Sequence, residues 1–188
     1  VPGAEIAFVA PEPGIKRTDQ GLGLVADVAL ADMPRPDIVV IPGGPGETVI
    51  RENERSLDWV RAAHETTTWT TSVCTGSLVL GAAGLLDGKR ATSHWLALDQ
   101  LAQYGAQPTL ERVVVEGKII TAAGVSAGID MGLTLAAALA GDEVAQIIQL
   151  GIEYDPQPPF DAGSPSKAPE AAVEFLRNRS RFVVNTER

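Results

Sequence analysis

Apolar residues are distributed along the chain in two ways: as short continuous runs, and as longer segments in which they recur every three or four positions. The clearest run, Asp37–Pro42 (DIVVIP), is almost entirely β-branched and ends in the loop Gly43–Gly46. Such a run is typical of a parallel strand that is buried on both faces and ends in a tight turn. A second run, Thr66–Val73, ends at Cys74, and between the two runs Arg51–Ala63 has the period of an amphipathic surface helix. This part of the chain therefore alternates strand, helix and strand.

The remaining apolar segments extend the same alternation. We expect short strands, bounded by Gly, Pro or Asp, over Ile6–Ala10, over Leu24–Leu30 and in a hairpin over Val113–Thr121 that turns at Glu116–Gly117. Helical spacing predicts helices, with polar N-caps or glycine stops, over Ser77–Gly84, His94–Tyr104 (N-cap Ser93, stop Gly105), Ser126–Leu139 (stop Gly141), Asp142–Ile152 and from Pro169 onward. Strands that alternate with such helices form βαβ units and a mainly parallel sheet covered on both faces. The fold class is therefore α/β, with active-site loops expected at the carboxyl ends of the strands.

The length of the chain predicts one domain over residues 1–188, because 188 residues can bury a core without disulfide or metal support. The longest apolar stretch, Met131–Ala140, lies between Asp130 and Asp142 and falls short of the ~20 residues of a membrane-spanning helix. We expect it to form a buried helix with no membrane role. The Pro- and Gly-rich segment Asp155–Pro169 predicts a surface arm that packs against the body of the domain or against a dimer mate.

Composition and charge narrow the possible partners and the compartment. Hydrophobic residues make up 45% of the chain and charged residues 21%, which is near the average for globular proteins. The net charge is −9 and no cluster of Lys or Arg stands out, which argues against nucleic acid as a direct partner. One cysteine cannot form an internal disulfide, and the chain opens with no secretory leader pattern, so we expect a cytoplasmic protein.

The single cysteine, Cys74, lies where a β-branched run ends and the helix-compatible run Leu78–Ala83 begins. A thiol on a sharp turn between a buried strand and a helix N-terminus is exposed at the carboxyl edge of the sheet, and the helix dipole there favours the thiolate. The alternative is a core thiol, because free cysteine is among the most buried residue types. These two interpretations of Cys74 have similar weight before wider sequence context is considered.

Several motifs, spread over nearly the whole chain, resemble the DJ-1/PfpI superfamily and within it most closely the isonitrile (isocyanide) hydratases. The motifs that carry the resemblance are DIVVIPGGPG (37–46), SVCTGSLVLGAAGLL (72–86), ATSHW (91–95), GVSAGID (124–130) and IEYDPQPPFDAGSP (152–165). The resemblance implies a flavodoxin-like α/β sandwich of the class I glutamine amidotransferase-like type. It also implies a homodimer, a cysteine nucleophile and neither a metal nor an organic cofactor.

The resemblance further implies a hydro-lyase reaction in which water adds to a small isonitrile to give an N-substituted formamide. Cys74 would attack the isonitrile carbon to form a thioimidate, which water then hydrolyses. Thr75 takes the place of a histidine found in the protease-like branch, which disfavours a Cys-His peptidase. We expect Gly43, Gly44 and Gly76 to form the oxyanion or substrate-binding loop, with the N–H groups of Gly44 and Thr75 stabilising charge.

Acid–base groups are the least certain part of the sequence-based site. His94 and Asp130 are further candidates for site residues, each with a structural role as the alternative. In the family an acidic residue from the first strand-and-helix unit approaches the cysteine, whereas this chain begins with Val1–Glu5 after the place of that unit. We therefore expect the first strand and helix, about 25 residues, to be absent from this chain.

Two other functions remain open. The ligand-binding halves of some AraC-type transcription regulators share the Cys-Thr-Gly and Ser-His-Trp patterns, which would make the domain a small-molecule sensor. A thiol-based protein acting on carbonyl or oxidative stress would also need a reactive cysteine.

Overall fold

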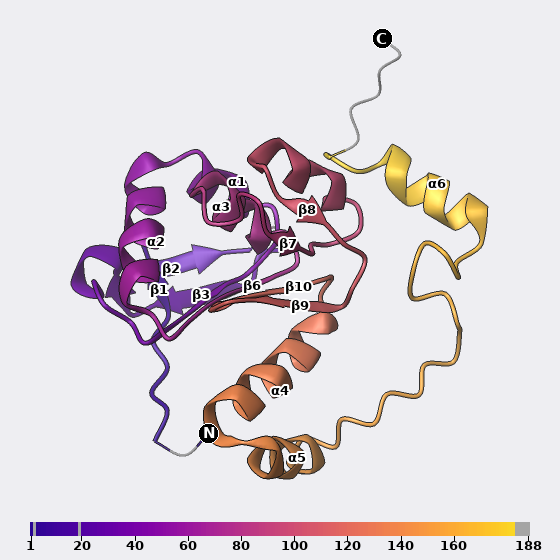
Figure 1. The fold of residues 1–188 in the computed structure, drawn as a ribbon. Helices are drawn as coiled ribbons and strands as arrows, with labels where there is room; N and C mark the ends of the chain where they lie inside the picture. Colours follow the sequence, from indigo (N-terminus) through magenta and orange to yellow (C-terminus); the bar gives the residue numbers. More distant parts are fainter. Residues whose placement is uncertain (2, 19, 183–188) are drawn as a thin grey trace.

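The computed structural model describes residues 1, 3–18 and 20–182 and centres on a four-stranded sheet. Strands β5 (Ile38–Ile41), β6 (Trp69–Val73), β10 (Ile119–Ala122) and β9 (Val113–Glu116) lie in the order β5-β6-β10-β9 (Figure 1). The first three strands are parallel and β9 pairs antiparallel with β10. The expected α/β class with a mainly parallel sheet is therefore confirmed.

Helices cover both faces of this sheet. Helices α1 (Glu47–Arg51), α2 (Glu54–Thr66) and α3 (Gly76–Ala82) lie on one side, and α4 (Ala127–Ala140) lies on the other, with α5 (Asp142–Gly151) packed against it (Figure 1). Helices α1 and α2 connect β5 to β6 on the first side, and α4 follows β10 on the opposite side.

The alternation of side chains along β10 divides the core into two halves. Ile119 packs with the cluster that includes Val60 of α2 and Leu78 of α3, whereas Ile120 packs with Met131 of α4. Successive residues of a strand point to opposite faces, so β10 contributes to both layers. The predicted two-sided burial of the sheet is confirmed at this strand.

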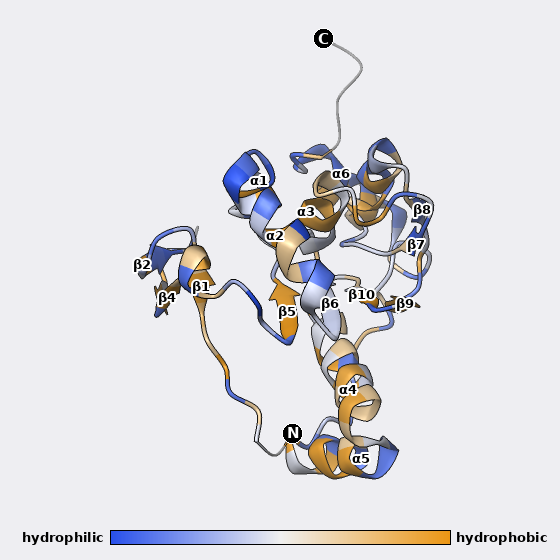
Figure 2. Ribbon diagram, turned by 60° about the vertical axis from the view of Figure 1, so that its left-hand side comes forward, coloured by the Kyte–Doolittle hydropathy of each residue, from blue (hydrophilic) through white to orange (hydrophobic). Residues whose placement is uncertain are grey.

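A small region of short strands lies beside β5 without pairing to it. Strand β1 (Val9–Ala10) pairs in parallel with β4 (Val28–Ala29), and β2 (Gly14–Arg17) forms a hairpin with β3 (Gly23–Ala26) (Figure 2). The expected strand over Ile6–Ala10 is thus only two residues long, and the one expected over 24–30 is broken at 27. No hydrophobic pattern marks β2, because all its residues are exposed and lack the buried face that patterning detects.

The other secondary structure is short or lies late in the chain. It comprises the 3₁₀ helices Leu30–Asp32 and Leu98–Tyr104, the parallel pair β7 (Arg90–Ala91) and β8 (Gln107–Pro108), and helix α6 (Glu170–Asn178). Gly105, with φ of 74°, ends the second 3₁₀ helix as predicted. The helix expected to start at His94 begins instead at Leu98.

Helix α1 is an addition to the predicted elements. It follows the Gly46 loop directly, has no side-chain N-cap, and is only one turn and a half long, so its sequence carries little helical signal. A separate helix, α2, begins after Asn53, whose side-chain oxygen accepts a hydrogen bond from the Ser56 N–H at 3.1 Å. The amphipathic helix expected over Arg51–Ala63 therefore corresponds to α2, and α1 precedes it as a separate short helix.

One prediction about burial is wrong, and the first part of the expected arm lies away from the body of the domain. Helix α4 is not a buried helix: Ile129 and Leu139 are about two-fifths exposed, because α4 packs on the sheet along only one side. Residues 155–163 of the predicted arm do not pack against the body but run outward toward α6, and Phe160 is 80% exposed (Figure 1). In the part of the chain that the structure describes, no helix has the length and apolar character needed to cross a membrane.

Candidate active site

Cys74 occupies a strained turn between β6 and α3. Its φ is 59°, a left-handed conformation that residues other than glycine rarely adopt. The backbone N–H of Cys74 donates to the carbonyls of Ala122 (3.0 Å) and Ala123 (2.9 Å), at the end of the adjacent strand β10. Strain of this kind persists only where surrounding contacts hold it, and it is typical of a nucleophile elbow.

Two serines hold the carbonyl of Cys74, in the peptide unit that follows. The hydroxyl of Ser93 donates to the Cys74 carbonyl at 3.0 Å, and that of Ser77 donates to it at 3.2 Å. Ser93 was expected to be an N-cap, and that prediction is wrong. Its side chain is buried and fixes the elbow, which leaves the following residues to form a turn.

Gly43 and Gly76 allow the loop after β5 to pack directly on the elbow. A Cβ at Gly43 would lie 2.6 Å from the Cys74 Cβ and 2.7 Å from the Thr75 nitrogen. A Cβ at Gly76 would overlap the Ile41 carbonyl oxygen and lie 2.8 Å from the Pro42 carbonyl oxygen. The structure therefore gives these two predicted site residues a close-packing role, and neither lines the pocket beside Cys74.

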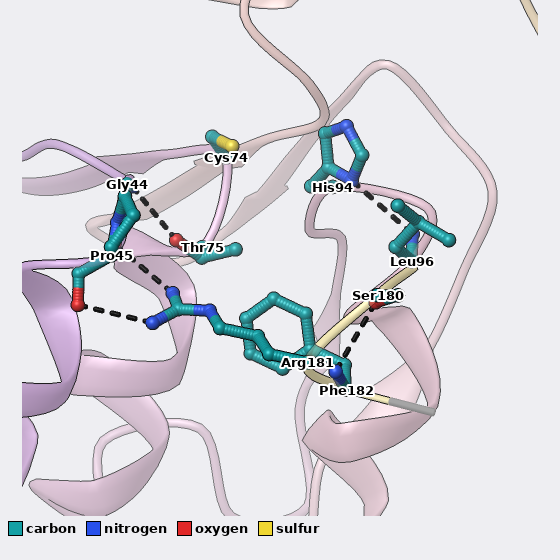
Figure 3. A pocket seen from close by; sticks show the side chains of 9 residues that line it. All are labelled: Gly44, Pro45, Cys74, Thr75, His94, Leu96, Ser180, Arg181 and Phe182. Atoms are coloured by element: carbon teal, nitrogen blue, oxygen red, sulfur yellow. Dashed lines mark hydrogen bonds between the residues drawn. The ribbon is translucent and has the colours of Figure 1, made fainter. Parts of the chain in front are cut away.

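Gly44 and Thr75 link the two loops by a hydrogen bond. Gly44 has a φ of 111°, and its N–H donates to the Thr75 Oγ1 at 3.0 Å (Figure 3). In this conformation the Gly44 N–H is therefore occupied and does not serve as the expected oxyanion donor. The hydroxyl and the backbone N–H of Thr75, the residue next to Cys74, also act to lower the pKa of the Cys74 thiol.

Burial dominates the ionisation of the Cys74 thiol. It raises the pKa of Cys74 above its ordinary value, while hydrogen bonds from Thr75 and the positive charge of Arg181 lower it and the charge of Glu47 raises it further. The net direction is opposite to the lowered pKa expected from the helix dipole, because α3 is short and the sulfur is largely shielded from water. At neutral pH the free thiol is thus mostly protonated, and its activation needs a proton acceptor.

An open pocket of about 260 Å³ lies over Cys74 (Figure 3). Four segments line it: the loop after β5, the elbow, the turn after β7 and the end of the chain, through residues Gly44, Pro45, Cys74, Thr75, His94, Leu96, Ser180, Arg181 and Phe182. Residues 180–182 were missed by sequence reasoning, because nothing in their local pattern relates them to loops more than a hundred positions earlier.

His94 faces the pocket, whereas Asp130 does not. The His94 Nδ1 accepts the Leu96 N–H at 3.3 Å, so the neutral ring carries its proton on Nε2. Asp130 instead binds the Arg112 Nε at 2.8 Å and the Tyr154 hydroxyl at 3.1 Å. Of these two candidates, the structure brings only His94 to the cysteine, and Asp130 ties α4 to the segments around it.

Replacing His94 should weaken the pH dependence of stability. Burial lowers the pKa of His94 below its ordinary value of 6.5, so the unfolded chain takes up a proton near that pH which the folded chain does not. The stability due to neutral His94 is therefore present above about pH 6.5 and declines as the pH falls through that value. We expect His94→Asn, whose Oδ1 can still accept the Leu96 N–H, to lose less Tm than the wild type between about pH 7.5 and 5.5.

His64 provides the matched control for this measurement. It is the other of the two histidines in the chain, and its pKa is also lowered chiefly by burial. Its Nδ1 lies 2.9 Å from the Thr70 Oγ1, away from the pocket. His64→Asn should reduce the same slope independently, without affecting the site. An unchanged pH dependence of Tm in His94→Asn would contradict the assignment.

Metal chemistry has no evident site among these groups. Within the described ranges of the chain, no three His, Cys, Asp or Glu side chains lie close enough to hold a metal ion.

The elbow, the glycine loop packed on it and the mainly parallel sheet beneath define an α/β protein with a cysteine on the turn after a central strand. The chain belongs to the DJ-1/PfpI family, whose sequence profile matches residues 2–138. This confirms the resemblance carried by the sequence motifs.

Comparison with individual relatives shows which members of the family this chain resembles. An isonitrile hydratase of Pseudomonas putida is 49% identical over 160 residues, which cover 85% of this chain and 70% of that protein. The HTH-type transcriptional regulator CdhR of Pseudomonas aeruginosa is 34% identical over 127 residues, which cover 66% of this chain and 38% of the regulator. The crystal structure of a ThiJ/PfpI family protein from Pseudomonas syringae has a TM-score of 0.90 at 40% identity, covering 94% of this chain and 74% of that chain.

Proposed function

We propose that this protein is an isonitrile hydratase-like hydro-lyase that converts a small isonitrile into an N-substituted formamide. The observation that carries the proposal is the strained Cys74 facing a small pocket, in a chain 49% identical to an isonitrile hydratase. Leu96 and Phe182 give the pocket an apolar wall, which suits an uncharged substrate.

The reaction has two steps at one carbon. The Cys74 sulfur forms a bond to the isonitrile carbon while a proton is delivered to that carbon, which gives a thioimidate. Water then adds to the thioimidate carbon, the carbon–sulfur bond breaks, and the sulfur is regenerated as the formamide leaves. The overall change is the addition of one water molecule. Thr75 supports the sulfur through its hydroxyl and N–H in both steps.

The proton must be carried by a group beside Cys74, and Glu47 is poorly suited to this. Its carboxylate is fully buried and accepts from the Arg51 Nε at 3.0 Å and from Arg181 at 2.9 Å, so both of its oxygens are engaged by guanidinium groups. We propose that the proton donor and acceptor is a carboxyl group on a further strand.

The free edge of β5 is where we place that strand. Among the described strands β5 pairs with β6 alone, and Val40 at this edge is 51% exposed. The region of strands β1 to β4 lies apart from β5 in Figure 2, and Phe8 and Val25 of this region are each more than half exposed. A parallel strand between them, supplied by residues ahead of Val1 and followed by a helix on the α4 side, would cover this surface and end beside the Cys74 loop.

We propose further that the protein is a cytoplasmic homodimer that binds neither nucleic acid nor membrane. A reducing compartment keeps the lone thiol free for reaction. Ile147, Leu150 and Ile152, at the outer side and end of α5, are each more than half exposed and offer an apolar surface to a second copy.

Formamide production from a simple alkyl or aryl isonitrile tests the proposal. We expect turnover by the protein extended upstream of Val1, and a rate lower by at least about a hundredfold for the chain that starts at Val1, because the proton carrier is missing. The measurement follows the formyl proton by NMR in both proteins. Absence of turnover in the extended protein would contradict the hydratase and favour a ligand sensor, as the similarity to CdhR would then suggest.

A further inference from the structure

The end of the described chain forms part of the site. After α6, residues Ser180, Arg181 and Phe182 return to the body and line the pocket opposite Cys74 (Figure 3). The Phe182 carbonyl accepts from the Gln100 side chain at 3.2 Å, and the Phe182 ring packs against the main core. This segment is therefore docked on the domain, unlike the exposed arm that precedes α6.

Arg181 makes four hydrogen bonds to one short stretch of the molecule. One terminal nitrogen donates to the Pro45 carbonyl and the Thr48 hydroxyl, both at 3.0 Å. The other donates to the Gly44 carbonyl at 3.1 Å and to Glu47 at 2.9 Å. The two terminal nitrogens have four N–H groups between them, so all four of these donors are used within the protein.

Two residues, Gly44 and Thr75, connect Arg181 to the Cys74 sulfur. Arg181 fixes the carbonyl of Gly44, and the N–H of Gly44 holds the Thr75 hydroxyl at 3.0 Å. Thr75 follows Cys74 directly and lines the same pocket, and its hydroxyl and N–H lower the pKa of the Cys74 thiol. A shift of the Gly44 loop therefore changes the groups that stabilise a thiolate.

Arg181 also balances the buried charge next to the site. The Glu47 side chain is completely buried, and Arg181 and Arg51 are the cations bound to it. The negative charge of Glu47 disfavours a thiolate at Cys74 and the positive charge of Arg181 favours it. His94 is the remaining titratable group on the pocket, and burial keeps it neutral at neutral pH.

We propose that Arg181 is a positioning residue, which docks the end of the chain on the Gly44–Glu47 loop and so sets the reactivity of Cys74. It acts through the loop and through its charge, without touching the substrate. Its effect on turnover rests on the proposed hydratase function, whereas its effect on the thiol does not.

The reactivity of the Cys74 thiol can be measured without isonitrile turnover, so it tests the role of Arg181 separately from the hydratase function. Cys74 is the only cysteine, so its alkylation by iodoacetamide as a function of pH reports on this site alone. We expect Arg181→Met to alkylate roughly fivefold more slowly at neutral pH, with the profile displaced to higher pH. Where isonitrile turnover is measurable, kcat/KM should fall by roughly tenfold or more. Arg181→Lys, which keeps the charge but not the four-bond geometry, should lie between the two proteins.

Arg179 supplies the matched control two positions earlier. Its guanidinium lies over the Phe175 ring at 4.3 Å, on the exposed end of α6, and Arg179→Met should match the wild type in both measurements. Wild-type alkylation profiles in Arg181→Met would overturn the proposal. If Arg181→Met does not fold, a wild-type profile and wild-type kcat/KM in Arg181→Lys would overturn it instead. A displaced profile in a protein that hydrates no isonitrile would support the role of Arg181 and contradict the hydratase function.

Discussion

Replacement of Cys74 by serine should reduce isonitrile hydration by a factor on the order of a thousand or more in the upstream-extended protein. A serine hydroxyl is nearly the same size as the thiol but far less nucleophilic near neutral pH, and no other cysteine can take over. The measurement is formamide formation under saturating isonitrile. The expected change is in kcat, because the thioimidate no longer forms.

Folding must be separated from chemistry in this variant. Cys74→Ser keeps the strained turn, since the hydrogen bonds of its backbone N–H and carbonyl do not involve the side chain. We expect its Tm to lie within a few degrees of the wild-type value, because the replacement removes little buried volume. Hydration at the wild-type rate by a folded Cys74→Ser protein would exclude the covalent route.

Replacement of Gly76 by alanine should have the largest effect on stability. The added Cβ would meet two backbone carbonyls, those of Ile41 and Pro42, and neither can move without shifting β5 or the loop that follows it. Overpacking of this kind typically lowers the free energy of unfolding by about 1 to 3 kcal/mol. Because the added Cβ of Gly76→Ala would meet backbone atoms, we expect a loss of about 3 kcal/mol or more. Urea denaturation of the purified protein measures the loss.

Gly132 is the matched control for Gly76. It lies within α4, is exposed, and a Cβ added there would meet no atom within 4 Å. Gly132→Ala should therefore stabilise the protein by up to about 1 kcal/mol, since alanine is the better helix former. Equal stability changes in the two variants would show that the contact of Gly76 with β5 is not close-packed.

The central strands and the elbow could be predicted because their signals are local. The run from Asp37 to Pro42 needs only β-branched residues and a glycine loop to be recognised as a buried parallel strand. Adjacent parallel strands then bring the loops after β5 and β6 together, and the hydrogen bond from Gly44 to Thr75 shows this convergence. The family resemblance rests in part on these same residues, together with motifs farther along the chain.

Other features of the site depend on the path of the whole chain. Ser93 has the sequence context of a helix cap, yet its hydroxyl donates to the Cys74 carbonyl from 19 positions away. Arg181 reaches the glycine loop across more than 130 positions, and no local pattern encodes such a contact. The direction of the Cys74 pKa shift could not be predicted either, because it depends on how much of the sulfur is buried.

The raised pKa of Cys74 bears directly on the mechanism. A thiol that is mostly protonated at rest holds the proton that the isonitrile carbon must gain, so addition needs a group that passes it from sulfur to carbon. This requirement agrees with a carboxyl on a strand at the free edge of β5. The elbow provides the nucleophile, and the proposed strand provides the proton transfer.

The most direct test is to observe the covalent intermediate on the upstream-extended protein. Enzyme in excess over an isonitrile is quenched with acid at short times and its intact mass is measured, followed by peptide mapping. The account predicts a species heavier by the mass of one isonitrile, modified at Cys74, that forms before the formamide and decays as the formamide appears. Formamide that accumulates at the same rate in Cys74→Ser, with no modified species at any time in the wild type, would contradict it.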